Sequence, residues 1–303
     1  MTKVDVADLD CIYLSYDEPK KEEFWVKIQN MIPWAKRVDS VQGSDAAHKA
    51  AAKASDTERF VLIDGDNMPY PEFFDITLDI KEEHQDCVFR WRAINEVNGL
   101  MYGNGGLSCW TRYFVNNMKT HENSDGADEN EVEFCYDPKY LPMNNVYSTT
   151  HPNGSAFHAW RAGFREGVKM CLQKGTKPSL IEFNEMVHKS NFDRLSIWHN
   201  IGQDAEYGDS CIAGARYGTY RTMLTDWDYT EVQDFYHLGE IYSEWKGVEQ
   251  TNINNLLQTR LGLHISEFTS EQSKFFKKHY SNTYTPAQPM TLEIEMLRKV
   301  EGW

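Results

Sequence analysis

One short run of sequence constrains the fold of this chain more than any other. The apolar residues 60–63, two of them β-branched, lead directly into Asp64-Gly65-Asp66. This pattern predicts a buried strand with two acids at its carboxyl end, the edge at which open α/β sheets bind ligands. Both carboxylates can face Mg²⁺ or Mn²⁺ carrying a diphosphate, because hard cations prefer oxygen ligands. A strand followed by an Asp-rich turn fits the same residues.

Two other classes of acidic motif are excluded by the neighbouring residues. A phosphatase of the haloacid dehalogenase class needs a Thr or Ser four residues after the first acid, where this chain has Met68. An EF-hand loop needs a glycine at its sixth position and a glutamate at its twelfth. This chain has Pro69 and Asp75 at those positions.

The segments before residue 60 alternate between apolar runs and helical patterns. Residues 10–16 predict a strand that exits into Ser15-Tyr16-Asp17, a stretch that can hold a nucleotide base or form a solvated turn. The elements predicted next are a helix over 20–31 and a strand over 35–41.

Residues 44–54 are rich in alanine and predict a second helix with a small-residue face. Ser44 or Asp45 would cap this helix. The free N–H groups of its first turn would attract an anion. His48 can face a ligand there or serve as a half-buried helix residue.

This order of elements, ending in Asp-x-Asp, resembles the nucleotide-binding half of the GT-A glycosyltransferases over about residues 8–70. The resemblance implies an α/β fold with a GT-A-like, Rossmann-like mixed sheet flanked by helices. It also implies that the first strand's exit holds the base of a sugar nucleotide and that a cation on Asp-x-Asp holds its diphosphate. The donor-binding residues implied are Ser15, Tyr16, Asp17, Asp45, His48, Lys49, Asp64, Gly65 and Asp66.

Residues 87–92 predict a strand that leads into a stretch rich in Gly and Asn, 95–106. Glycines this dense indicate ordinary turns or a loop where backbone approaches a ligand. The Tyr-Gly-Asn-Gly-Gly run resembles a GT-A element that lies where the donor sugar meets its acceptor. The substrate-binding residues predicted in this region are Arg90, Trp91, Arg92, Asn98, Tyr102, Gly105 and Gly106.

Residues 195–209 combine an apolar run, interpreted as a strand, with a loop that carries an imidazole and three carboxylates. Such groups suit a general base or a metal ligand. His199 is a candidate ligand beside Asp64 and Asp66, and Arg216 can neutralise charge on a departing diphosphate. Surface loops fit both stretches equally well. The predicted base is Asp204, with the rivals Glu206 and Asp209.

Six stretches together narrow the resemblance. They are Pro-Trp-Ala-Lys-Arg, Ala-Ala-His-Lys-Ala-Ala, Asp-Gly-Asp, Asn-Gly-Leu-Met-Tyr-Gly-Asn-Gly-Gly, Ala-Trp-Arg-Ala-Gly-Phe-Arg-Glu and Gly-Ala-Arg. Over about residues 8–220 they resemble a family of bacteriophage glycosyltransferases. Some phage enzymes of this kind add glucose or arabinose to 5-hydroxymethylcytosine in their own DNA. The resemblance therefore favours 5-hydroxymethylcytosine in double-stranded DNA as the acceptor, and its base would have to leave the stack.

The charge of the chain counts against DNA. It has 31 Lys plus Arg against 46 Asp plus Glu, a net charge of −15. Duplex binding normally gains affinity from Lys and Arg on phosphates. A local basic track would have to come from Arg90, Arg92, Arg161, Arg165 and Lys169.

Composition also indicates the cellular compartment in which the protein is expected. The six cysteines are scattered with no Cys-x-x-Cys pair, which favours reduced packing residues over a structural zinc site. No apolar run approaches the roughly 18 residues of a membrane span. We therefore expect neither a signal peptide nor an anchor, no membrane partner, and a cytoplasmic protein, in the host cytoplasm if the chain is phage-encoded.

Two regions are predicted along the chain. Residues 1–225 would form the catalytic domain, interrupted by an acidic, solvated insertion at 121–137. A helix within this domain would begin after Ser155 and run to about residue 173. Residues 226–303 would form a helical extension that covers the site or contacts the acceptor.

The sequence therefore predicts a metal-dependent glycosyltransferase that moves a hexose or pentose from a UDP-sugar to an acceptor hydroxyl. A glycan or protein acceptor, a nucleotidyltransferase of similar fold and a non-catalytic binding protein are the alternatives. Neither the sugar nor the stereochemical outcome can be read from these residues.

Overall fold

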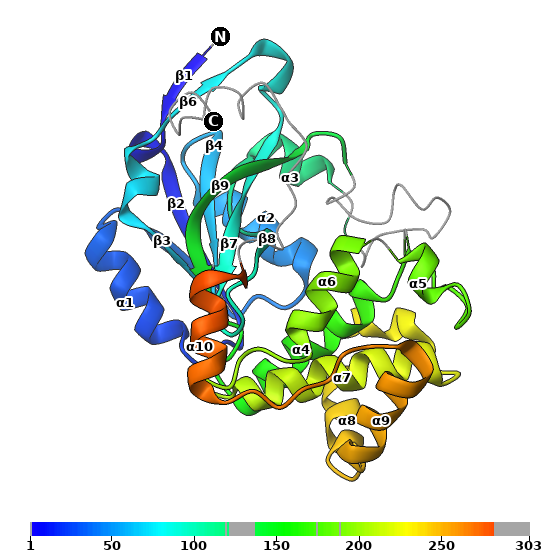
Figure 1. Cartoon of the computed structure of the whole chain (residues 1–303). Helices are drawn as coiled ribbons and strands as arrows, with labels where there is room; N and C mark the ends of the chain where they lie inside the picture. The colour runs from blue at the N-terminus through cyan, green and yellow to red at the C-terminus, as the bar shows by residue number, and fades with distance from the viewer. Residues whose placement is uncertain (1, 119, 121–136, 174, 188, 282–303) are drawn as a thin grey trace. The chain divides into compact units, whose positions relative to one another are not determined.

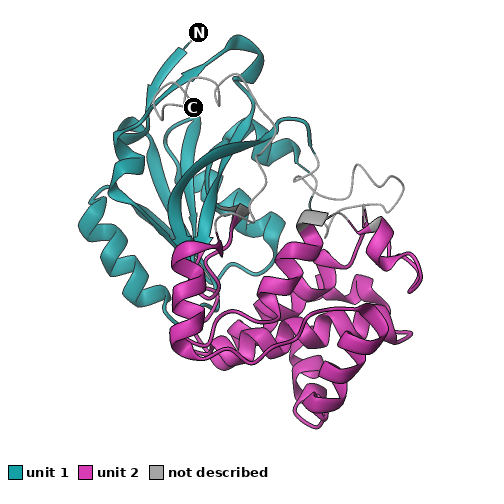
Figure 2. Cartoon of the chain, in the orientation of Figure 1, with its two compact units in different colours: residues 1–94, 102–150, 287–303 teal, residues 95–101, 151–286 magenta. Residues whose placement is uncertain are grey.

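The computed structural model describes residues 2–118, 120, 137–173, 175–187 and 189–281. The chain divides into two compact units (Figure 2). The predicted boundary after residue 225 falls inside unit 2, and nearly all of the predicted acidic insertion lies outside the described residues. Unit 1 consists of Met1–Ile94, Tyr102–Thr150 and Ala287–Trp303, and unit 2 of Asn95–Met101 and His151–Pro286.

Unit 1 is built on a mixed seven-stranded sheet (Figure 1). Its strands, in spatial order, are β3 (Lys36–Asp39), β2 (Asp10–Ser15), β4 (Arg59–Asp64), β8 (Met101–Thr111), β7 (Val88–Asn95), β9 (Tyr140–Thr150) and β5 (Asn67–Pro69). β2 pairs in parallel with β3 and β4, whereas β4 pairs antiparallel with β8 and β5 with β9. A separate antiparallel pair joins β1 (Thr2–Asp5) to β6 (Thr77–Ile80).

Successive side chains of β4 enter two different cores. Val61 and Ile63 pack in the core on the side of α1 (Lys21–Met31), and Phe60 and Leu62 pack on the side of α2 (Ser44–Ala54) and α3 (Arg112–Asn117). Because successive strand residues point to opposite faces, a sheet covered on both sides needs apolar residues at every position. This explains why the run before the acidic pair is apolar without a break.

The predicted order of elements in this half of the chain is confirmed. The segments 10–16, 20–31, 35–41, 44–54 and 60–63 form β2, α1, β3, α2 and β4 in turn. The predicted cap of α2 is wrong, because Gly43 occupies the N-cap position and no side chain caps the helix. The α/β class, a mixed sheet flanked by helices, is therefore correct.

Unit 2 is helical. Its helices are α4 (Ala156–Met170), α5 (Phe183–Met186), α6 (Lys189–Trp198), α7 (Gly208–Leu224), α8 (His237–Trp245), α9 (Gln250–Leu261) and α10 (Ser270–His279). The predicted helix after Ser155 is confirmed, and the Ser155 side chain caps α4. The described part of the predicted helical extension beyond residue 226 contains α8, α9 and α10. The strand predicted near residue 195 is wrong, since those residues form α6.

Helices α4 and α7 cross at backbone distance. Gly163 and Gly167 of α4 face Gly214 and Gly218 of α7, and a Cβ on any of the four would overlap a carbonyl oxygen of the opposite helix. Both pairs follow the Gly-x-x-x-Gly spacing, which places the two glycines on one face of a helix. The Gly-Ala-Arg stretch, interpreted from the sequence as a diphosphate-binding element, is part of this crossing.

The cysteine prediction is confirmed for the five cysteines that the structure describes. All five are buried free thiols, and Cys135 lies outside the described residues. Burial raises the pKa of the Cys171 thiol to about 12, so the thiol stays protonated at neutral pH. A protonated, buried thiol packs as a small apolar side chain.

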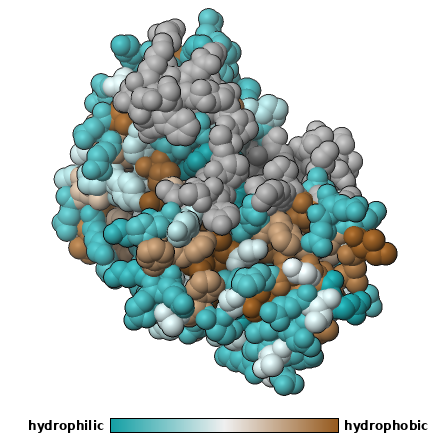
Figure 3. All heavy atoms as spheres, viewed as in Figure 1, coloured by the Kyte–Doolittle hydropathy of each residue, from teal (hydrophilic) through white to brown (hydrophobic). Residues whose placement is uncertain are grey.

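Hydrophilic and hydrophobic residues both reach the surface of the chain. Hydrophilic residues spread over much of the face drawn in Figure 3. Among the helices that the structure describes, none combines the length and the apolar character needed to cross a bilayer.

Candidate functional site

The carboxyl ends of three neighbouring strands of unit 1 carry polar side chains. In the parallel register, Ser15 of β2 lies opposite Asp39 of β3, and Leu14 lies opposite Asp64 of β4. The exits of β2, β3 and β4 therefore lie next to one another at the ligand-binding edge of the sheet.

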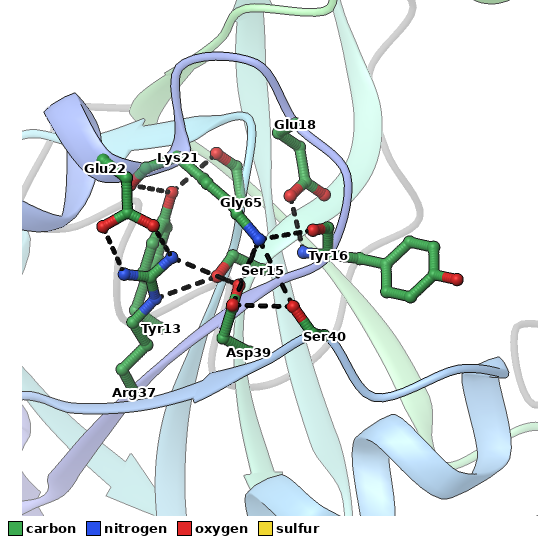
Figure 4. A network of polar contacts seen from close by, with 10 residues as sticks. All are labelled: Tyr13, Ser15, Tyr16, Glu18, Lys21, Glu22, Arg37, Asp39, Ser40 and Gly65. Carbon is green, nitrogen blue, oxygen red and sulfur yellow. Dashed lines mark hydrogen bonds and ion pairs between the residues drawn. The ribbon is translucent and has the colours of Figure 1, made fainter.

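Asp39 is the centre of a polar network at this edge (Figure 4). The Ser15 hydroxyl donates to Asp39 at 2.6 Å, and the Lys21 ammonium donates to both carboxylate oxygens at 2.8 and 3.1 Å. Burial alone would raise the pKa of Asp39, but hydrogen bonds from Lys21, Ser15 and Ser40 hold that pKa well below its usual range. Asp39 is therefore an oriented, ionised carboxylate.

The loop that follows β2 is fixed by the same network. Lys21 also donates to the Tyr16 carbonyl oxygen at 2.6 Å. Arg37 forms a two-pronged pair with Glu22, at 2.8 and 2.7 Å, and donates through Nε to Ser15 at 3.1 Å. Tyr16 is 42% exposed, so a flat aromatic side chain is available beside the exit of β2.

The turn at Gly65 is held from two sides. The Tyr13 hydroxyl donates to the Gly65 carbonyl oxygen at 2.8 Å. The Glu18 carboxylate accepts a hydrogen bond from the Tyr16 amide at 2.7 Å and lies so close to Gly65 that a Cβ there would overlap it. A glycine is therefore needed at this position unless Glu18 moves.

Three carboxylates approach one another at this turn. Burial raises the pKa of Asp64 to about 8, and the charges of Asp66 and Glu18 add to that rise. Burial likewise raises the pKa of Glu18, and the nearby Asp66 and Asp17 add to it. Repulsion of this kind is relieved by a bound cation.

The acidic pair has the chemistry of a cation site in which a bound diphosphate supplies the remaining ligands. Within the described residues, no three Cys, His, Asp or Glu side chains are grouped so as to hold a metal ion. Mg²⁺ needs no such group, because it is commonly bound through one or two carboxylates plus phosphate oxygens and water. Asp64 and Asp66, both half-buried, supply two carboxylates at one turn, and their metal role stays a prediction.

The predicted donor contacts on α2 are engaged within the helix and its neighbours. Lys49 pairs with Asp45 at 2.7 Å, and His48 Nδ1 lies 2.8 Å from the Ser44 carbonyl oxygen. The His48 ring packs on Trp110 with 4.9 Å between ring centroids. A donor role for these three residues stays a prediction.

Strand β7 does not present its basic and aromatic residues as predicted. Trp91 is fully buried against Phe73 and Tyr147, so it packs in the core, and its substrate role stays a prediction. Arg92 is 7% exposed and donates to Asn144 at 3.0 Å. The Arg90 guanidinium lies 5.3 Å from the centre of the Tyr140 ring. Alternation along a strand buried on both faces explains this arrangement.

The glycine-rich stretch is also not the predicted loop. Tyr102, Gly105 and Gly106 belong to β8, and the side chains at 102–105 lie outside the described residues. The turn before β8 contains Asn98, which is fully buried and accepts a hydrogen bond from the Leu100 amide at 3.1 Å. The stretch forms a strand because β8 lies between β4 and β7, which offer backbone partners on both sides.

The predicted base and its rivals belong to unit 2. Asp204 is half-buried and pairs with Lys277 at 2.7 Å, and Lys277 also donates to the Glu96 carbonyl oxygen at 3.0 Å. Glu206 and Asp209 are exposed. The ion pair with Lys277 holds the Asp204 carboxylate in place, as an oriented base requires.

His199 and Arg216 hold unit 2 together. His199 is fully buried, with Nε2 2.9 Å from the Thr219 hydroxyl. Arg216 donates to the His199 carbonyl oxygen at 2.9 Å and pairs with Glu267 at 3.0 Å. These contacts give both residues a packing role, while their metal and diphosphate roles stay predictions.

We expect the burial of His199 to make unit 2 sensitive to acid. Burial lowers the pKa of His199 to about 3, and the Arg216 charge adds to this effect. In the unfolded chain the His199 imidazole takes up a proton near pH 6.5, whereas in the folded chain it stays neutral. The contribution of neutral His199 to the unfolding free energy is therefore complete above pH 6.5 and falls by about 1.4 kcal/mol per pH unit below it. Between pH 7 and 5, wild type should lose about 2 kcal/mol more unfolding free energy than His199→Gln, measured by urea titration. Parallel losses would contradict this.

The sequence interpretation missed Glu18, Lys21 and Asp39. Asp39 is the last residue of β3, but the strand was predicted to run on to residue 41, so the rule that located Asp64 did not pick out Asp39. Lys21 lies 18 residues from Asp39 in the sequence, and no local pattern links the two.

Comparisons with known proteins add little to this site. No protein-family profile matches the chain, and no curated protein matches it. One similar solved structure is a glycosyltransferase involved in the glycosylation of the major capsid of PBCV-1, with 14% identity, a TM-score of 0.31, and coverage of 48% of this chain and 94% of that one. Another is HddC from Yersinia pseudotuberculosis, with 16% identity, a TM-score of 0.27, and coverage of 48% and 74%. Likenesses this low support no statement about activity.

Proposed function

We propose that this chain is a cation-dependent glycosyltransferase that takes its sugar from a nucleoside diphosphate sugar, with UDP as the expected nucleotide. One observation supports the proposal above the others: Asp64 ends β4 directly beside the polar exits of β2 and β3, and Asp66 follows two residues later. A nucleoside diphosphate needs an aromatic ring for its base, an oriented acid for its ribose and a cation site for its diphosphate. Tyr16, Asp39 and the acidic pair supply these groups in that order.

Each of these residues would have a separate task. A cation held by Asp64 and Asp66 would offset the negative charge that develops on the departing diphosphate. Tyr13 fixes the turn between the two acids through the Gly65 carbonyl oxygen. Asp39, held by Lys21, would accept hydrogen bonds from hydroxyl or N–H groups of the nucleoside. Asp204 would accept the proton of the acceptor hydroxyl.

The acceptor is less well supported than the donor. Of the basic residues proposed as a DNA track, Arg92 is buried and bonded to Asn144, and Lys169 pairs with Glu166. Arg161 and Arg165 both lie over the Phe235 ring. These positions weaken the case for duplex DNA carrying 5-hydroxymethylcytosine, and a glycan acceptor gains by comparison.

The donor and acceptor can be separated in one assay. Purified chain is incubated with a panel of UDP-sugars and Mn²⁺, and free UDP is measured with hydroxymethylated DNA, unmodified DNA, a neutral glycan or no acceptor. We expect UDP release that stops when the metal is chelated and rises with a single acceptor class. Pyrophosphate release from a nucleoside triphosphate would instead identify a nucleotidyltransferase. Absence of both products would contradict the proposal.

A further inference from the structure

Unit 2 contains a hollow that the proposed transfer reaction does not explain. It has a volume of about 440 Å³ and lies beside the carboxyl end of α7. The hollow is an open depression and not an enclosed cavity. Tyr217, Tyr220, Arg221, Asp226 and Trp227 line it.

The wall of the hollow is aromatic. The rings of Tyr217 and Tyr220 are stacked, with 6.1 Å between centroids. The Arg221 guanidinium lies 5.2 Å from the centre of the Trp227 ring and 5.7 Å from that of Tyr217. Such rings combine an apolar face with a polar edge. Tyr217 is buried, so the partly exposed Tyr220 and Trp227 offer the aromatic surface. That surface complements a pyranose ring, which has an apolar face and hydroxyls at its edge.

The charges around the hollow disfavour an anion. Arg221 already pairs with Glu244 at 3.1 Å. Asp226 lines the hollow as an exposed acid. Lys177, which is not a lining residue, donates to the carbonyl oxygen of the lining residue Thr225 at 3.1 Å. A phosphate or carboxylate would have to compete with Glu244 for Arg221 and would face the charge of Asp226. A neutral ligand with several hydroxyls meets neither obstacle.

The rim is fixed before any ligand arrives. The Trp227 indole N–H donates to Glu231 at 2.6 Å, and its backbone amide donates to the Thr225 hydroxyl at 3.2 Å. That hydroxyl in turn donates to the Arg221 carbonyl oxygen at 2.6 Å. Groups that are already ordered lose little conformational entropy on binding.

We propose that this hollow binds a pyranose unit of a neutral saccharide. The binding of a saccharide is inferred from the chemistry of the hollow alone. That the hollow forms part of the acceptor site rests on the proposed function, and in that case the acceptor would be a glycan.

The test is saturation-transfer NMR on the full-length chain, without donor or cation, with methyl glucoside, methyl galactoside, methyl mannoside and the charged methyl glucuronoside. We expect a neutral glycoside to bind with a Kd on the order of 1 mM and the glucuronoside to bind more weakly. Tyr220→Ala should weaken neutral binding about tenfold by removing one ring. Tyr236→Ala, at an aromatic residue that is 67% exposed and not part of the hollow, should bind as wild type does.

Two arms keep the outcomes distinct. Asp226→Lys, at an exposed position, should raise glucuronoside binding relative to the neutral glycosides, which checks the charge argument even if Tyr220→Ala fails to fold. Asp66→Ala should bind the neutral glycoside unchanged, so failure of the transferase proposal would leave this result intact. The inference would be overturned if no neutral glycoside gave a saturation-transfer signal at a concentration about tenfold above the expected Kd. It would also be overturned if Tyr220→Ala bound the neutral glycosides as tightly as wild type.

Discussion

Replacing Asp66 with alanine should lower sugar-nucleotide turnover by about 100-fold or more. The carboxylate would hold the cation that offsets charge on the leaving diphosphate, and losing one preorganised electrostatic contact of this kind usually costs about 10²–10³ in kcat. The measurement is UDP release at saturating donor over a range of Mn²⁺ concentrations. Excess Mn²⁺ should restore part of the activity if weakened metal binding is the cause.

The folded state should not suffer from this change. Asp66 adds to the charge repulsion on Asp64 and Glu18, so its removal should leave the melting temperature of the metal-free chain equal or raised. Asp86→Ala is a matched control in unit 1, because Asp86 is an exposed acid that pairs with Lys139 away from the acidic turn. Full turnover by Asp66→Ala, or an equal loss in Asp86→Ala, would rule out a metal role for the pair.

The largest expected effect on stability comes from the crossing of α4 and α7. A Cβ at Gly167 would overlap the Ala215 carbonyl oxygen, and one at Gly218 would overlap that of Phe164. Backbone atoms cannot rotate away as a side chain can, so the helices must separate. Over-packing usually costs about 1–3 kcal/mol, and we expect Gly167→Ala and Gly218→Ala each to reach at least the upper part of that range. Urea unfolding followed by circular dichroism measures the loss.

Gly239 offers an internal control. It lies within α8, and apart from its chain neighbours and the local backbone of α8 no atom lies within 4 Å of where its Cβ would be. Alanine is the better helix former by roughly 0.5–1 kcal/mol, so Gly239→Ala should stabilise the chain. The same substitution is therefore expected to have opposite signs at two kinds of helical glycine. A change at Gly167 or Gly218 within about 0.5 kcal/mol of wild type, the range of ordinary surface substitutions, would mean that the helices cross farther apart.

Local patterns predicted the first half of the sheet and left its polar contacts unknown. Apolar runs and helical spacing determine β2, α1, β3, α2 and β4, because each element satisfies its own backbone and buries its own face. The partnership of Lys21 with Asp39 depends instead on the parallel register of β2 and β3, which no single segment encodes. The acidic pair was predictable because both acids directly follow the buried run that positions them.

The errors have physical causes as well. The apolar residues near 195 form a helix because a short apolar run fits a strand or a buried helix equally well. Trp91 was assigned to a surface because β7 was interpreted without knowing that both of its faces are covered. At Gly214 and Gly218 the arginine between them drew the interpretation toward diphosphate binding, although the four-residue spacing of the glycines was the informative feature.

The glycine crossing also determines which parts of unit 2 can move independently. Two backbones in direct contact leave no side chain that can adjust, so neither α4 nor α7 can turn or slide without the other. Because α6 and α8 pack on α4, and α9 packs on α7, these three helices take their positions from one rigid pair. Substitutions in the connecting loops and on the outer helix faces should therefore be tolerated. The placement of the helices depends instead on the four glycines at the crossing of α4 and α7.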